Sequence, residues 1–234
     1  MEKDLINRAR KKDVQAISEI VQKTQRKAIY FAYKVVNDEA LAKDIVLQSY
    51  ILAFQNLDQL MDDGNFEHWF GRKVSEQLLN QIEYEKNSSL NSSFYVDEED
   101  RIEFDANVRN DKMPFKIESF MNVQEIQDST QSVLNLLTEK QRLMLMMYYF
   151  ENMSIFEIAD IFGVSENAVK DNLAYVRKKI MNILSNANVR SMSFLSCFLN
   201  DQMSKMISCH VSVDTIVEAI RCIPQQVGIY DNMS

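Results

Sequence analysis

Apolar residues recur along most of the chain at three- and four-residue steps, which is the spacing of one face of an α-helix. Asn37-Asp38 interrupts this pattern, and Asp38 is placed to cap a helix over residues 39–57. Residues 62–65 predict a loop, after which a further helix is expected. The predicted buried positions are Leu5, Ala9, Val14, Ile17, Val21, Ala28 and Ile29, then Phe66, Trp69, Phe70, Val74, Leu78 and Ile82.

The stretch from Thr138 to Ile180 carries the most specific local signals. Thr138 with Gln141, and Ser154 with Glu157, each have the spacing of a capping box, in which each side chain satisfies an amide of the other's turn. Gly163 supplies a tight backbone position between two amphipathic helices. This order of short helix, turn and second helix predicts a helix-turn-helix.

Composition favours an all-α protein. The chain has 234 residues but only four Gly and two Pro, and it is rich in helix-forming residues. Between residues 87 and 128 the helical pattern gives way to NSSLNSS and an acidic run, which predicts a polar, flexible linker. Residues 186–234 contain two short apolar repeats that predict a helical extension, packed on the helix-turn-helix domain or on a partner.

Several kinds of chemistry are not indicated. Three widely spaced cysteines, Cys197, Cys209 and Cys222, do not form a disulfide framework, and two histidines are too few for a metal centre with them. No phosphate-binding glycine loop or nucleophile motif is present, so we expect no catalytic residues, no enzyme activity, no cofactor and no metal. Without a long apolar run we expect no membrane insertion and a cytoplasmic location.

The segment LTEKQRLMLMMYYFENMSIFEIADIFGVSENAVKDNLAYVRKKI resembles the C-terminal domain of bacterial RNA polymerase sigma factors, especially the extracytoplasmic-function (ECF) group. The resemblance implies that the second helix reads the −35 promoter element in the major groove. The residues expected on its outward face are Asn167, Lys170, Asp171, Ala174, Tyr175 and Lys178.

A second resemblance covers the amino-terminal part. NDEALAKDIVLQSYILAFQNL followed by FEHWFGRKV is similar to the N-terminal domain of the same family. The resemblance implies that this domain binds the β′ clamp helices of core RNA polymerase and opens the −10 element. The implied polymerase-binding residues are Asp44, Leu47, Gln48 and Tyr50, and the implied −10 residues are Arg72, Lys73, Glu76 and Asn80.

The expected organisation is therefore two small helical domains joined by a flexible linker, with a short helical extension. Residues 1–86 form the first domain, 87–128 the linker, 129–185 a four-helix sigma-type helix-turn-helix domain, and 186–234 the extension. The family resemblance adds promoter DNA, the polymerase β flap and an anti-sigma factor as implied partners.

Departures from the family pattern leave alternatives open. Glu76, Glu83, Glu85 and Asp171 stand where cations or neutral residues are usual, and the net charge of the chain is −8. Because phosphate contacts supply most nonspecific DNA affinity, such a chain would bind duplex DNA weakly alone. The main hypothesis is an ECF-like sigma factor. The alternatives are a sigma-derived interaction protein that does not read promoters, and a self-sufficient helix-turn-helix transcription factor.

Overall fold

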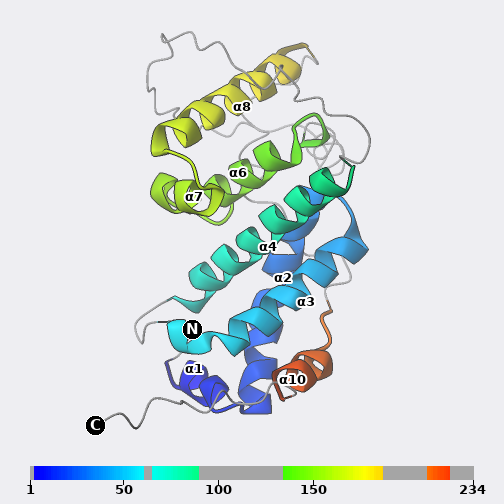
Figure 1. Cartoon of the computed structure of the whole chain (residues 1–234), viewed down its shortest axis with the longest axis vertical. Coiled ribbons are helices and arrows are strands. Elements are labelled where there is room, and N and C mark those ends of the chain that lie inside the picture. The colour runs from blue at the N-terminus through cyan, green and yellow to red at the C-terminus, as the bar shows by residue number, and fades with distance from the viewer. Residues whose placement is uncertain (1–2, 61–64, 90–133, 187–209, 222–234) are drawn as a thin grey trace, which may run out of the picture.

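The computed structural model describes residues 3–60, 65–89, 134–186 and 210–221, and every regular element in them is a helix (Figure 1). The all-α fold expected from the sequence is confirmed. The helices are α1 (Lys3–Arg10), α2 (Val14–Val36), α3 (Glu39–Gln55), the short 3-10 helix η1 (Leu57–Gln59), α4 (Phe66–Ser89), α6 (Glu139–Tyr149), α7 (Ile155–Phe162), α8 (Glu166–Asn186) and α10 (Val213–Arg221).

The helix boundaries follow from local chemistry. Asp13 accepts hydrogen bonds from the amides of Gln15 and Ala16 and so begins α2. Asn37 ends α2 in the left-handed conformation, with φ of 57°. Asp38 then accepts from the amide of Leu41 at 3.0 Å, which confirms it as the cap of α3.

The N-terminal bundle, α1 to α4, is built around aromatic side chains from α3 and α4. Tyr50 is fully buried, lies 4.2 Å from Phe70 between ring centroids, and hydrogen-bonds Thr24 of α2 at 2.5 Å. Phe66 stacks on both Phe54 and Phe70. The apolar face predicted for residues 66–82 therefore packs into this core, with only Trp69 partly exposed.

The helix-turn-helix unit, α6 to α8, has its own buried residues. Leu143, Met146 and Met147 of α6 are fully buried, as is Val169 of α8. Arg177 of α8 donates a hydrogen bond to the Tyr149 hydroxyl and lies over the rings of Tyr148 and Tyr149. These contacts fix the direction of α8 relative to α6.

The two units pack directly on each other. α6 contacts both α2 and α4, and α7 contacts α4, so the buried residues form one continuous core (Figure 1). At the junction, Phe150 stacks on Phe31 with a centroid distance of 6.2 Å and lies 5.5 Å from Tyr30. We call this arrangement the closed form.

Helix α10 packs on α2 and α3, although these helices are far from it in the sequence. Ile216, Val217 and Ile220 are buried there, and the amide of Val211 donates to the Gln25 side chain at 2.9 Å. The expectation that the extension packs on the helix-turn-helix domain or on a partner is wrong for this helix, because its apolar face is covered by the N-terminal bundle. The predicted linker, the 62–65 loop apart from Asn65, and all three cysteines lie outside the described residues.

Candidate nucleic-acid interface

The helix-turn-helix has the geometry that its capping residues predict. Ser154 Oγ accepts from the amide of Glu157 at 3.2 Å, and the Glu157 carboxylate accepts from the Ser154 amide at 2.9 Å. After α7, Gly163 adopts φ of 65°, a conformation that costs little only without a side chain. Ser165 then caps α8 by accepting from the Ala168 amide at 3.2 Å.

The outward face of α8 is open to solvent over its first turns. Asn167, Lys170, Asp171 and Lys178 are exposed, whereas Ala174 and Tyr175 are partly buried. Lys170 is paired only loosely with Glu166, at 3.8 Å, and both side chains are about half exposed. An exposed ion pair of this kind contributes little and leaves the ammonium group available to a phosphate or a base edge.

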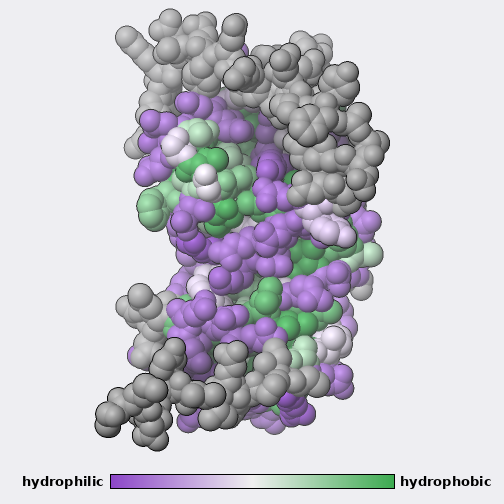
Figure 2. Space-filling model, viewed as in Figure 1, coloured by the Kyte–Doolittle hydropathy of each residue, from purple (hydrophilic) through white to green (hydrophobic). Residues whose placement is uncertain are grey.

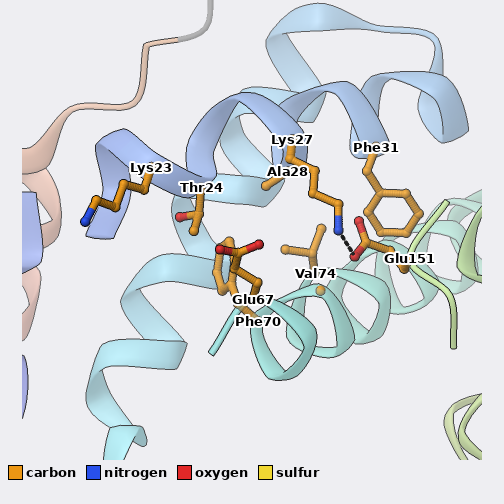
Figure 3. A pocket seen from close by; sticks show the side chains of 10 residues that line it. Lys23, Thr24, Lys27, Ala28, Phe31, Glu67, Phe70, Val74 and Glu151 are labelled. Carbon is orange, nitrogen blue, oxygen red and sulfur yellow. Dashed lines mark hydrogen bonds and ion pairs between the residues drawn. The ribbon is translucent and has the colours of Figure 1, made fainter. Parts of the chain in front are cut away.

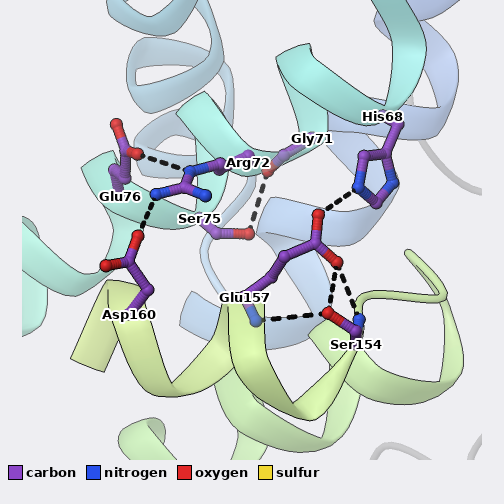
Figure 4. A network of polar contacts seen from close by, with 8 residues as sticks. All are labelled: His68, Gly71, Arg72, Ser75, Glu76, Ser154, Glu157 and Asp160. Carbon is purple, nitrogen blue, oxygen red and sulfur yellow. Dashed lines mark hydrogen bonds and ion pairs between the residues drawn. The ribbon is translucent and has the colours of Figure 1, made fainter. Parts of the chain in front are cut away.

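The four candidate −10 residues lie along α4, and three of them, Arg72, Lys73 and Glu76, are paired within the protein. Arg72 donates to Glu76 at 3.2 Å and also to Asp160 of α7 (Figure 4). Lys73 donates to the other Glu76 oxygen at 3.0 Å and lies over the Trp69 ring. Asn80 is exposed. Glu76 thus neutralises both cations of this face.

The candidate polymerase-binding residues on α3 do not all share one surface. Asp44 and Gln48 are exposed one turn apart, and Leu47 is partly buried against the core. Tyr50 is fully buried and bonded to Thr24, so its placement on the polymerase face is corrected. The stacking of its ring inside the bundle explains why a tyrosine occupies position 50.

A polar network joins α4 to the helix-turn-helix (Figure 4). His68 Nε2 lies 2.5 Å from Glu157 Oε1, and the second Glu157 oxygen is held by Ser154. Partial burial raises the pKa of Glu157, but the contact with His68 and the hydrogen bonds from Ser154 outweigh this and lower it to about 2. The same carboxylate therefore caps α7 and ties it to the N-terminal bundle.

A second polar contact between α2, α4 and the helix-turn-helix unit is more deeply buried. Lys27 of α2 donates to Glu151 at 2.8 Å, and the Glu151 side chain is only 4 % exposed (Figure 3). Burial raises the pKa of Glu151, and the nearby Lys27 opposes that shift. Gly71 of α4 faces this carboxylate so closely that an added Cβ would lie 2.7 Å from Glu151 Oε2.

Neither a metal centre nor a membrane span is indicated in the described part of the chain. No three His, Cys, Asp or Glu side chains of the described residues are grouped to hold a metal ion. None of the described helices is both long and apolar enough to cross a bilayer. Figure 2 shows polar side chains across α4 and a more apolar patch over α7, where Phe156 is 67 % exposed.

Comparison with known proteins agrees with this geometry. The family model described as sigma-70, region 4 matches residues 127–180, which include α6, α7 and most of α8. The chain is 22% identical over 173 residues to the ECF RNA polymerase sigma factor SigW of Bacillus subtilis (strain 168), covering 74% of this chain and 91% of SigW. The chain is therefore similar to ECF sigma factors over most of its length, and to sigma-70 region 4 in its helix-turn-helix.

Other similarities of the chain cover different shares of the relatives. It is 23% identical over 171 residues to the probable RNA polymerase sigma factor RfaY of Xanthomonas campestris pv. campestris, covering 73% of this chain but only 40% of that relative. A co-crystal structure of the sigma factor RpoE in complex with the anti-sigma factor NepR, from Bartonella quintana, has a TM-score of 0.49 and 14% identity, over 72% of this chain and 96% of that one.

The sequence alone did not single out the residues that join the two units: Lys27, His68, Gly71, Glu151 and Asp160. One signal was available. Gly71 lies inside a helix, where glycine costs about 1 kcal/mol relative to alanine, and such a glycine marks a close approach of another group.

Proposed function

We propose that this chain is an ECF sigma factor, which binds core RNA polymerase and directs transcription initiation at specific promoters. The observation that carries the proposal is the similarity to SigW over 173 residues and 91% of that relative, which is much longer than the helix-turn-helix. The alternative, a sigma-derived protein that does not read promoters, is not favoured, because the reader helix keeps its caps, its turn and an exposed face.

For the −35 element, the proposed readers are on the first turns of α8. Lys170 is the strongest candidate, because it is exposed and only loosely paired. Asn167 lies one turn earlier and is also exposed, and its amide can both donate to and accept from a base edge. Asp171 would repel phosphate, so we expect it to face bases or to weaken binding. Lys178, further along, is placed for a phosphate contact.

For polymerase, the proposed contact is the exposed side of α3 at Asp44 and Gln48, with Leu47 at its edge. By resemblance the partner surface is the β′ clamp helices, and the β flap would bind the helix-turn-helix unit. We also propose that an anti-sigma factor is a partner of this chain and that the protein is located in the cytoplasm. Since the chain carries a net charge of −8, tight binding to promoter DNA depends on the cationic surface of the polymerase.

The test is to add the purified chain to core polymerase and to score two outcomes. The first is co-elution on gel filtration, and the second is run-off transcription from chromosomal fragments of the organism that carries the gene. We expect co-elution together with transcripts that core polymerase alone does not make. Co-elution without new transcripts would support the alternative. Tight binding to duplex DNA without co-elution would indicate an autonomous transcription factor.

A further inference from the structure

Helix α10 is fixed to the N-terminal bundle at both of its ends as well as by its apolar face. The Val211 amide, just before the helix, donates to the Gln25 side chain of α2 at 2.9 Å. At the other end, the carbonyl of Ile220 accepts from Lys12 Nζ at 3.4 Å. Lys12 lies in the turn before α2 and adopts a left-handed backbone with φ of 61°. These contacts determine which side of α10 faces outward.

Helix α3 has an open side, and α10 borders it. α3 packs on α2, α4 and α10, and Figure 1 shows it passing between α4 and α10 with α2 behind. Its exposed residues Asp44, Gln48 and Leu52 follow one another at four-residue steps, so they line one stripe of the helix. We call these three residues the α3 stripe. Leu52, which is 37% exposed, gives the stripe an apolar contact beside two polar ones.

The outward side of α10 is polar and lies next to α3. Asp214 and Glu218 are exposed one turn apart, on a different side of the helix from the buried Ile216, Val217 and Ile220. The axes of two packed helices are only about 8–10 Å apart. A partner that covers the α3 stripe and is wider than one helix therefore reaches α10 as well.

The α3 stripe is too small to hold a partner by itself. A stable interface buries about 800 Å² on each partner and involves about 20–30 residues of each, and three side chains supply only a small part of that. The interface must therefore extend onto α4 or α10, the two helices beside α3. Helix α4 carries the candidate −10 residues, which the proposed function assigns to DNA, so α10 is the flank that remains.

We propose that core polymerase binds a composite surface, made of the α3 stripe and the outward side of α10. The inference rests on the proposed function, since it adds a second helix to the polymerase contact on α3. It gives α10 a role in binding, although the family match at residues 127–180 does not include this helix. The polymerase surface that fits is basic, to meet Asp44, Asp214 and Glu218, and presents an apolar side chain to Leu52.

The test reverses the charge on the outward side of α10 in the full chain. Affinity for core polymerase is measured by competition with dye-labelled wild-type chain, without DNA. We expect Asp214→Lys/Glu218→Lys to bind about tenfold more weakly than the wild type at low salt. The difference should largely vanish at about 1 M salt, where charges are screened within about 3 Å.

Two further variants separate this effect from net charge and from damage to the fold. Glu83→Lys/Glu85→Lys makes the same charge change at exposed positions near the carboxyl end of α4, which Figure 1 shows far from α10. This control should bind within about twofold of the wild type at low salt. Asp214→Asn/Glu218→Gln keeps the size and shape of both side chains and should lose affinity to a smaller extent than the reversal. Urea titration should give all three variants the midpoint of the wild type.

The outcomes distinguish this inference from the proposed function. If the reversal on α10 binds as tightly as the wild type, or more tightly, the composite surface is wrong and the proposed function stands. A loss of affinity that persists unchanged at high salt, or that the α4 control shares, would also overturn the composite surface. If the wild-type chain does not bind core polymerase, the proposed function fails, and the inference fails with it.

Discussion

Gly71 and Glu151 lie against each other across the interface, where a Cβ on Gly71 would be 2.7 Å from the Glu151 carboxylate. Gly71→Ala should therefore push the carboxylate away from Lys27 and weaken closure by about 1–2 kcal/mol, the scale of one buried charge-assisted hydrogen bond. The same change should stabilise α4 itself by up to about 1 kcal/mol through helix propensity. Hydrogen exchange of α4 and small-angle scattering of the whole chain would measure the two effects separately.

The double variant Gly71→Ala/Glu151→Ala is the control for that result. With the carboxylate gone, the added methyl group meets no close atom of residue 151, so the two changes should be strongly non-additive. Additive effects on compactness would show that the contact between these residues does not control closure.

Removing the cation that faces Glu151 should also destabilise the closed form. Lys27→Met leaves a buried carboxylate without its ammonium partner, and we expect a loss of about 2 kcal/mol in the free energy of unfolding. Lys23→Met, one turn earlier on α2, is the matched control, because Lys23 pairs with Glu19 in a half-exposed position. Its expected loss is below about 0.5 kcal/mol. Equal losses in urea titrations would contradict the role of the buried pair.

Acid should weaken the contribution of Glu157 to the stability of the folded chain. Its pKa in the folded chain is about 2, against an ordinary value of 4.5, so its stabilising effect is complete above 4.5 and is lost as the pH falls toward 2. The wild type should exceed Glu157→Gln in stability by about 1 kcal/mol at neutral pH, and the difference should shrink between pH 4.5 and 2. Glu218→Gln, which removes an exposed carboxylate on α10, should show no such trend.

Much of the fold could be predicted because helical periodicity and capping chemistry are local. Asp38, Thr138, Ser154 and Gly163 each act on residues within one turn, and each begins or ends a helix as expected. Helix α8 also lies where these signals predict it, and its role as the DNA-reading helix stays a prediction.

The closed form could not be predicted from those signals. Its contacts join residues 57 to 124 positions apart, such as Lys140 with Glu83 and Lys27 with Glu151, and no periodicity links them. Tyr50 was misplaced for a related reason: a tyrosine with one polar atom suits either a surface or a core with a partner, and Thr24 supplies that partner.

A substitution in α8 tests DNA recognition separately from polymerase binding. Lys170→Glu should abolish promoter-dependent transcripts while leaving co-elution with core polymerase unchanged, because it reverses the charge of an exposed residue that we propose to face the major groove. Lys11→Glu makes the same charge change at an exposed position in the turn after α1 and should keep most activity. Equal activity of Lys170→Glu and wild type would contradict the assignment of this face.

Helix α10 should stabilise the N-terminal bundle. Ile216→Ala removes a fully buried side chain from its contact with α2 and α3, and we expect a loss of about 2 kcal/mol. Glu218→Ala on the exposed side of the same helix should change stability by less than about 0.5 kcal/mol. If both variants unfolded at the same urea concentration, the docking of α10 would not contribute.

The most direct measurement is run-off transcription by core polymerase with and without the purified chain, scored together with co-elution. The account predicts that the chain co-elutes with core polymerase and yields transcripts that core polymerase alone does not make. Co-elution without new transcripts would contradict the reading of promoters on which the account depends.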